Sequence, residues 1–219
     1  MDFIVTGASG WAGKTLLEKL DFEGLFNSEN RVFAYSSTAK VIRLTSGREI
    51  KSLALTELKT LKCETPFIFH FAFLTREKAN LMEFYDYVSK NRQITSLLAE
   101  TIERTKPQFV VNISSGAASG RQASNPTVER KEEAYGILKL AEELRISDAC
   151  KKIQKCKFAI GRLWGASGNE MPVGAKYALS DFITQGLAKQ KITIKSNNKV
   201  FRRYVDMQEF ITVLKTAAE

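Results

Sequence analysis

Short apolar runs alternate with longer stretches of helical periodicity along most of the chain. Near-continuous apolar runs of this kind are typical of strands that are buried on both faces of a parallel sheet. The regular alternation of strand and helix favours a doubly wound, Rossmann-like α/β fold with a mostly parallel sheet. The expected strands are residues 3–6, 32–35, 67–73, 109–113 and 158–163, and the helices between them are residues 11–20, 79–105 and 129–153.

Two parts of the chain depart from this alternation. Residues 40–44 and 49–53, joined by Ser46-Gly47, predict a hairpin or two successive short strands. From Gly165 onward the pattern becomes less regular. There we expect a helix over residues 177–189, a short strand over residues 192–194 and a final helix over residues 207–218.

The composition is that of a globular protein, because 44% of the 219 residues are hydrophobic and 26% are charged. No apolar run reaches the roughly 18 residues of a membrane-spanning helix. The start of the chain has neither a basic flank nor a cleavage pattern. We therefore expect a cytoplasmic protein without a membrane partner.

The formal net charge of +9 favours anionic ligands. The basic residues are scattered, and no basic stripe is interleaved with aromatic residues, so we expect no nucleic-acid partner. The cysteines, Cys63, Cys150 and Cys156, lack the spacing of metal ligands, and His70 is the single histidine. No metal site is therefore expected.

A glycine-rich turn follows the first expected strand and opens the first expected helix. Gly7, Gly10 and Gly13 have the spacing G-x-x-G-x-x-G. The first glycine permits a tight turn, the second allows the backbone to approach a pyrophosphate, and the third allows the helix to lie close to the sheet. The helix start then presents free N–H groups to the phosphates. This turn predicts a dinucleotide-binding site.

The end of the second expected strand bears on which dinucleotide is bound. A carboxylate at this point normally binds the ribose hydroxyls of NAD, but no Asp or Glu occurs between Arg31 and Gly47. Ser36 and Ser37 offer small donors there, and Lys40 and Arg43 are nearby cations. These residues favour the 2′-phosphate of NADP over NAD.

Three residues have the chemistry to move a proton to or from an alcohol oxygen. Tyr135 and Lys139 are four residues apart on one expected helix face, and Ser115 follows the strand over residues 109–113. The ammonium would lower the pKa of the phenol from its usual value of about 10. The serine hydroxyl could bind the same substrate oxygen while nicotinamide exchanges hydride at carbon. This set predicts a dehydrogenase-type active site.

These motifs resemble those of the extended short-chain dehydrogenases/reductases, in the NAD-dependent epimerase/dehydratase (nucleotide-sugar) branch. The resemblance covers essentially the whole chain. Residues 6–13 match the family's T-G-x-x-G-x-x-G, and Tyr135 and Lys139 match its Y-x-x-x-K. The first match implies that Ser9 and Trp11 also contact the cofactor, and the second implies that the tyrosine and lysine bind it.

Further cofactor residues come from the resemblance alone. His70-Phe71-Ala72-Phe73 resembles the family's H-x-A-A beside the cofactor, and Asn91 occupies the central-helix asparagine position. Phe71, Ala72, Phe73 and Asn91 are therefore implied to lie at the cofactor. Phe73 departs from the pattern, because it replaces a small residue and would crowd the nicotinamide ribose.

The resemblance also implies substrate residues. Residues 114–120 resemble S-S-x-x-V-Y-G, which places the catalytic serine at Ser115 rather than Ser114. Gly165 replaces a polar residue that often touches the sugar nucleotide, and the family's nucleotide-contacting arginine corresponds to Arg202.

The chain stops within its final helix, whereas the family usually continues. We thus expect a Rossmann domain over residues 1–164 and a partial substrate-binding region over residues 165–219, interleaved with the Rossmann core.

Gly116-Ala117 replaces the Asp-Glu pair that dehydratases of the family carry after the catalytic Ser or Thr. The resemblance therefore implies an epimerase or a keto-sugar reductase that acts on a nucleotide sugar with NADP or NAD. Tyr135 would be the acid/base, Lys139 its pKa modifier and ribose ligand, and Ser115 the group that polarises the sugar oxygen.

Two alternatives stay open. One is an NADP-dependent reductase of a non-nucleotide carbonyl compound, which the glycine at position 165 would suit. The other is a non-catalytic dinucleotide-binding protein, which would not need the Ser/Tyr/Lys set. The family's four-helix interface would make the protein a homodimer.

Overall fold

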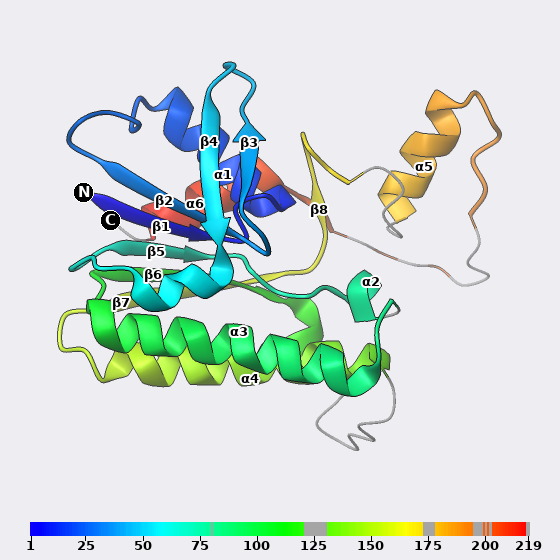
Figure 1. Cartoon of the computed structure of the whole chain (residues 1–219). Helices are drawn as coiled ribbons and strands as arrows, with labels where there is room; N and C mark the ends of the chain where they lie inside the picture. The colour runs from blue at the N-terminus through cyan, green and yellow to red at the C-terminus, as the bar shows by residue number, and fades with distance from the viewer. Residues whose placement is uncertain are drawn as a thin grey trace.

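A seven-stranded sheet with helices on both faces forms the centre of the molecule (Figure 1). The computed structural model describes residues 1–79, 81–120, 131–172, 178–194, 199, 201 and 203–217. The strands of the sheet are β1 (Asp2–Thr6), β2 (Arg31–Ser36), β3 (Lys40–Arg43), β4 (Glu49–Ala54), β5 (Phe67–His70), β6 (Phe109–Ser115) and β7 (Lys157–Leu163). The helices that flank it are α1 (Trp11–Phe22), α2 (Arg76–Ala79), α3 (Phe84–Thr105), α4 (Lys131–Lys151) and α6 (Met207–Thr216).

The sheet has the strand order β3-β4-β2-β1-β5-β6-β7. All neighbouring pairs are parallel except β3 and β4, which form an antiparallel hairpin. From β1 the chain goes to β2 on one side and later to β5 on the other. Ligands of open α/β sheets bind at such a switch point, outside the carboxyl ends of the strands. The carboxyl ends of β1, β5 and β6 therefore define where a site is expected.

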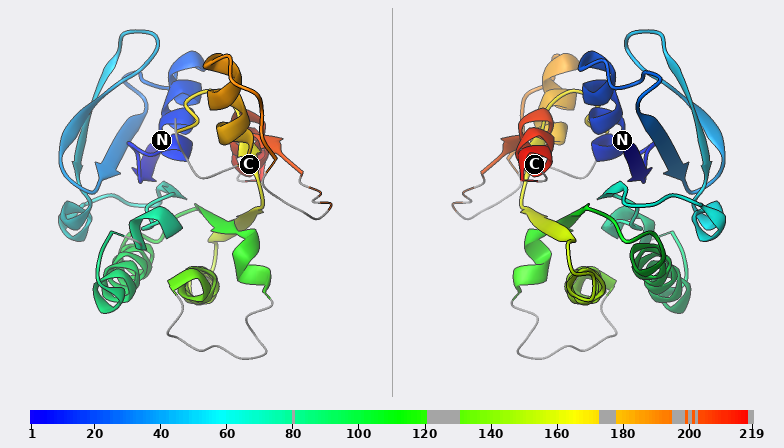
Figure 2. Two further views of the ribbon diagram at one scale, coloured as in Figure 1. Left: turned by 90° about the vertical axis from the view of Figure 1, so that its right-hand side faces the viewer. Right: turned by 90° about the vertical axis from the view of Figure 1, so that its left-hand side faces the viewer.

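The central strands divide the interior into two hydrophobic clusters, because successive side chains of a strand point to opposite faces. On β1, Phe3 and Val5 pack with residues of α1 and α6, whereas Ile4 packs with residues of α3 and α4. Figures 1 and 2 show α3 and α4 side by side on one face of the sheet and α1 and α6 on the other. The doubly wound fold predicted from the sequence is confirmed.

Two sequence predictions of secondary structure were wrong in detail. The helix expected over residues 79–105 is divided into α2 and α3, because Glu83 has an extended backbone and the second helix begins at Phe84. The break allows Ala79 and Tyr87 to be buried in one small cluster beside α4. Residues 192–194 were expected as a strand but form none, and the side chains of Ile192 and Ile194 are exposed.

The C-terminal part of the chain returns to the sheet. β8 (Ala166–Ser167) and β9 (Val205–Asp206) form a separate two-stranded pair, and α5 (Ala178–Leu187) has one buried residue, Ser180.

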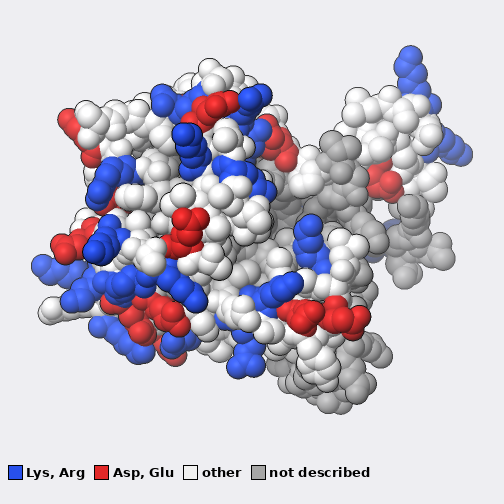
Figure 3. All heavy atoms as spheres, in the orientation of Figure 1, with Lys and Arg blue, Asp and Glu red and all other residues white. Residues whose placement is uncertain are grey.

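No helix in the described part of the chain is long and apolar enough to cross a membrane. On the face of the molecule in Figure 3, basic and acidic side chains are interspersed, as the scattered charge of the sequence predicts.

An ion pair between the exposed Arg162 and the buried Glu143 fastens α4 to β7. Arg162 on β7 donates to both carboxylate oxygens of Glu143, at 2.9 and 2.7 Å, and the hydroxyl of Ser114 on β6 also donates to this carboxylate. Burial raises the pKa of Glu143, but the hydrogen bonds from Arg162 and Ser114 outweigh burial, so the pKa lies below its ordinary value of 4.5. The pair therefore stabilises the charged form in the folded protein.

Glu143→Gln should lower the free energy of unfolding by about 1–3 kcal/mol at neutral pH, because a charge-assisted hydrogen bond is lost. Since folding lowers this pKa, the contribution is present above pH 4.5 and is lost as the pH falls through the lowered value. Urea denaturation as a function of pH measures this effect. In the control Glu103→Gln, an exposed pair with Lys152 is broken, and a change below about 1 kcal/mol is expected. An equal loss in both variants at neutral pH would contradict the interpretation.

Asp206 is the N-cap residue of α6, the helix that packs against α1. Its carboxylate accepts from the backbone N–H groups of Gln208 and Glu209, at 2.8 and 3.3 Å. Asp206→Ala should therefore destabilise the protein by about 1 kcal/mol in thermal or urea denaturation. Val213→Ala on the exposed face of the same helix is the matched control and should change stability little.

Candidate functional site

The glycine-rich turn connects β1 to α1 at the carboxyl edge of the sheet. Gly7 has φ of +67°, and a Cβ there would lie 2.6 Å from the carbonyl of Phe71. A Cβ on Gly13 would collide with the carbonyl oxygen of Gly7. Both glycines are thus required by close backbone approach. Ser9 and Gly10, between them, are exposed, so the turn and the start of α1 are open to a ligand.

This turn suits the diphosphate part of a dinucleotide. The first N–H groups of α1 have no intrahelical acceptor, and the helix dipole adds positive potential at this end. Trp11, the first residue of α1, is engaged elsewhere, since its indole Nε1 donates to the carbonyl of Asn169 at 2.7 Å. The indole thereby fastens the segment after β8 beside the turn.

The predicted ribose and 2′-phosphate residues are only partly brought together. Ser36 ends β2, and its Oγ is buried with no hydrogen-bond partner among the described residues, while Ser37 is exposed. Arg43 instead pairs with Glu49 at the other end of the β3–β4 hairpin, with Nε and Oε1 2.8 Å apart. Since Ser36 pairs with Ala54, five residues after Glu49 on β4, the register separates Arg43 from Ser36 by about 16 Å.

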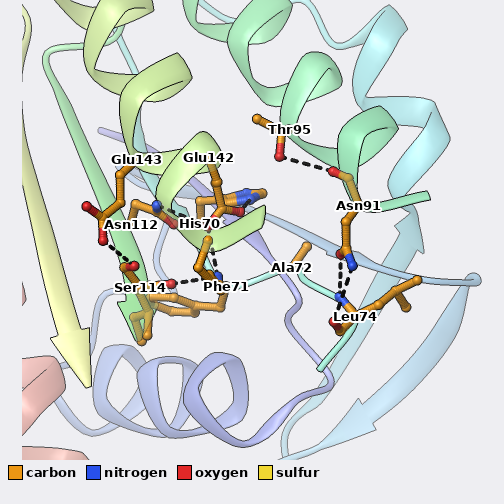
Figure 4. A network of polar contacts seen from close by, with 12 residues as sticks. His70, Phe71, Ala72, Leu74, Asn91, Thr95, Asn112, Ser114, Glu142 and Glu143 are labelled. Atoms are coloured by element: carbon orange, nitrogen blue, oxygen red, sulfur yellow. Dashed lines mark hydrogen bonds and ion pairs between the residues drawn. The ribbon is translucent and has the colours of Figure 1, made fainter. Parts of the chain in front are cut away.

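A buried polar network connects the glycine turn to α4 (Figure 4). The hydroxyl of Thr6 lies 2.7 Å from Nδ1 of His70, and Nε2 of His70 lies 3.3 Å from Oε1 of Glu142. A carboxylate can only accept, so the N–H at Nε2 donates to Glu142. The backbone N–H groups of Phe71 and Ala72 donate to the threonine oxygen at 3.3 and 3.4 Å. The network therefore fixes the strand end and the segment that follows it.

The same carboxylate holds Lys139. Its ammonium donates to Oε2 of Glu142 at 2.8 Å and to the carbonyl of Ile113 at 2.9 Å, and Asn112 donates to the same carboxylate oxygen at 3.3 Å. Burial raises the pKa of Glu142, but Lys139 and His70 together hold it below its ordinary range. Glu142 is 0% exposed and Lys139 5% exposed, so this is a buried ion pair.

Tyr135 lies one turn before Lys139 on α4. Its ring makes an edge contact with Phe73, at 5.7 Å between centroids, and the guanidinium of Arg76 lies 5.4 Å from its centroid. Phe73 also contacts the lysine, whose Nζ is 3.9 Å from the ring centroid. The structure therefore brings Tyr135, Lys139 and Phe73 together at the end of β5.

The two serines at the end of β6 have different environments. Ser114 is 2% exposed and donates to Glu143. Ser115 is half-buried, and its Oγ accepts from the N–H of Ala117 at 3.2 Å, which caps the short helix η2 (Gly116–Ser119) against α4. Of the two hydroxyls, that of Ser115 is thus the one left open to a substrate.

Asn91 anchors the segment after β5 rather than lying open to a ligand. It is 1% exposed, its Oδ1 accepts from the N–H of Leu74 at 2.8 Å, and its Nδ2 donates to the carbonyl of Leu74 at 3.3 Å (Figure 4). Both backbone groups of the residue after Phe73 are therefore held by one side chain on α3.

The expected substrate residues lie on the C-terminal segment. A Cβ on Gly165 would come within 2.7 Å of the carbonyl oxygen of Arg203, and the carbonyl of Gly165 accepts from the N–H of Val205. Gly165 thus allows two segments to pack closely. Arg202 lies outside the described residues.

Three residues of this region were missed from the sequence: Glu142, Glu143 and Arg76. From the sequence, the two glutamates were assigned no role beyond belonging to the expected helix over residues 129–153. A usable signal was the i,i+3 spacing of Lys139 and Glu142, which places both on one face. Arg76 has no signal in the sequence, because its contact with Tyr135 depends on the break between α2 and α3.

Similarity to known structures supports the fold. A UDP-N-acetylglucosamine 4-epimerase from Methanobrevibacter ruminantium, in complex with UDP-N-acetylmuramic acid, is 18% identical with a TM-score of 0.75, and the match covers 99% of this chain and 72% of that chain. A GDP-D-glycero-L-gluco-heptose synthase from Campylobacter jejuni, in the presence of NADPH, is 16% identical with a TM-score of 0.70, covering 98% and 73%.

A UDP-glucuronic acid 4-epimerase from Bacillus cereus, in complex with NAD, is 18% identical with a TM-score of 0.65, covering 97% and 72%. A search of curated proteins found no match. The model of the NAD dependent epimerase/dehydratase family matches residues 3–219. With the match spanning nearly all of the sequence, the chain belongs to the NAD dependent epimerase/dehydratase family.

Proposed function

We propose that the protein oxidises or reduces a sugar carbon of a nucleotide sugar with NAD(P), as an epimerase or a keto-sugar reductase. The observation that carries this proposal is the position of Tyr135 and Lys139 on one turn of α4, where both contact Phe73. Two residues before it, Phe71 lies against Gly7 of the open glycine turn. The three similar structures act on or bind nucleotide sugars, which supports the substrate class.

Each of the proposed residues has its own role in the reaction. When bound, the nicotinamide takes hydride from the sugar carbon or returns it. Tyr135 takes the hydroxyl proton as the alcohol becomes a carbonyl and gives it back in the reverse direction. Lys139, one helical turn away on α4, binds the hydroxyls of the nicotinamide ribose. Ser115 donates a hydrogen bond to the same substrate oxygen and keeps it oriented.

The proposed cofactor is NADP. The support is the end of β2, where Ser36 and Ser37 stand in place of an acid, together with Lys40 at the near end of β3. A 2′-phosphate bound there would accept hydrogen bonds from the exposed hydroxyl of Ser37 and from the ammonium of Lys40. Of the two cations that the sequence offered, Arg43 is paired with Glu49, which leaves Lys40 as the nearer candidate.

Tyr135→Phe should lower turnover at least 100-fold while changing the affinity for NAD(P)H little, because only the proton-transfer group is removed. Conversion of UDP-N-acetylglucosamine or UDP-glucose, followed by chromatography, measures turnover, and nicotinamide fluorescence measures binding. Tyr85→Phe removes the same atom from an exposed tyrosine of α3 and is the matched control. Undiminished turnover in Tyr135→Phe would overturn the assignment.

Lys40→Ala should weaken the binding of NADPH about tenfold and leave NADH unchanged, because a charge-assisted contact to the 2′-phosphate is lost. Arg43→Ala serves as the control and should change neither affinity. Equilibrium titrations with both nucleotides provide the measurement. Tighter binding of NADH than NADPH by the unmodified protein would contradict the proposed preference.

A further inference from the structure

The ammonium of Lys139 has three hydrogens, and a neighbouring group of the protein lies in front of each of them. Two hydrogen bonds go to Glu142 and to the carbonyl of Ile113. The third side faces the ring of Phe73, at 3.9 Å from the centroid. Lys139 is 5% exposed. In this arrangement the lysine cannot reach the hydroxyls of a ligand, although the proposed function requires it to bind the nicotinamide ribose.

The two sides of the ammonium differ in how firmly they are held. Glu142 is fully buried and has His70 and Asn112 as further partners, so moving it would leave several buried polar groups unpaired. Phe73 is only half-buried and is held by ring contacts. The phenyl ring is therefore the part that can move.

The backbone next to this ring is fixed. Asn91 binds both backbone groups of Leu74, and Thr6 binds the N–H groups of Phe71 and Ala72. Movement at Phe73 is thus restricted to its side chain. Rotation of the ring away from α4 would uncover the ammonium and the phenol face of Tyr135 together, because the ring contacts both.

We propose that Phe73 controls entry of the nicotinamide half of the cofactor, because its ring occupies the side of Lys139 from which the ribose must be bound. This proposal rests on the proposed function. The glycine turn is open and does not depend on the ring, so the adenosine diphosphate half binds whether the ring has moved or not. Binding of the second ribose competes with the contact between the ring and the ammonium.

Phe73→Ala removes the competing ring. We expect the affinity for ADP-ribose and for NAD(P)H to rise about thirtyfold, which is the size of a desolvated cation–π contact, and the affinity for ADP to stay unchanged. Isothermal titration with the three ligands measures this difference. If the alanine variant is poorly folded, Phe73→Leu is the second variant, because leucine keeps apolar volume in the cluster. It should raise the affinity for the same two ligands, by a smaller factor.

Phe84→Ala is the matched control, because Phe84 packs in the same small cluster but has no contact with Lys139 among the described interactions. It should change none of the three affinities. Equal gains in both variants would overturn the proposal, since general loosening of the cluster would explain them. A gain for NAD(P)H without one for ADP-ribose would also overturn it, because the ribose would then not be the group excluded.

The two proposals fail in different ways. If the unmodified protein and every variant bind none of the ligands, including ADP, the proposed function fails and this inference fails with it. If the unmodified protein binds ADP and NAD(P)H and Phe73→Ala changes nothing, only the inference is overturned.

Discussion

A carboxylate that water does not reach, Glu142, connects the parts of the molecule on which the site depends. An unpaired charge in such a position would cost several kcal/mol, so Glu142 keeps its charge only through Lys139, His70 and Asn112. Through His70 the same charge fixes the hydroxyl of Thr6, the residue before the glycine turn. The proposed phosphate-binding turn and the proposed acid/base pair are thus positioned by one buried network, which runs from Glu142 on α4 through His70 on β5 to Thr6 on β1.

The sequence predicts most of the fold because its strands are nearly continuous apolar runs and its glycines obey a simple steric rule. Gly7 and Gly13 have no room for a Cβ, so their identity was informative. The strand expected at Ile192-Thr193-Ile194 was wrong, because an exposed segment that pairs with no strand in the described part of the chain can have the same composition as a strand.

Side-chain networks were the part that the sequence could not predict. Glu142 lies between Leu138 and Ile146 on the buried face of α4, but only the partners His70, Ser114 and Arg162, far away along the chain, explain why charged side chains are buried there. Arg43 shows the opposite error. It is near Ser36 in sequence, yet the register of a hairpin separates them, and register depends on pairing rather than on local composition.

The packing of α6 on α1 has a consequence for how the chain is made. Lys215 pairs with Glu23 at 2.7 Å across 192 residues of sequence, and Met207, Ile211 and Leu214 complete the cluster around β1 and α1. Contacts of such long range form late, because loop closure must precede them. During synthesis at about 5–20 residues per second, the nascent chain therefore carries an uncovered apolar stripe until α6 has left the ribosome. We expect chaperones that bind exposed apolar segments to occupy this stripe throughout that interval.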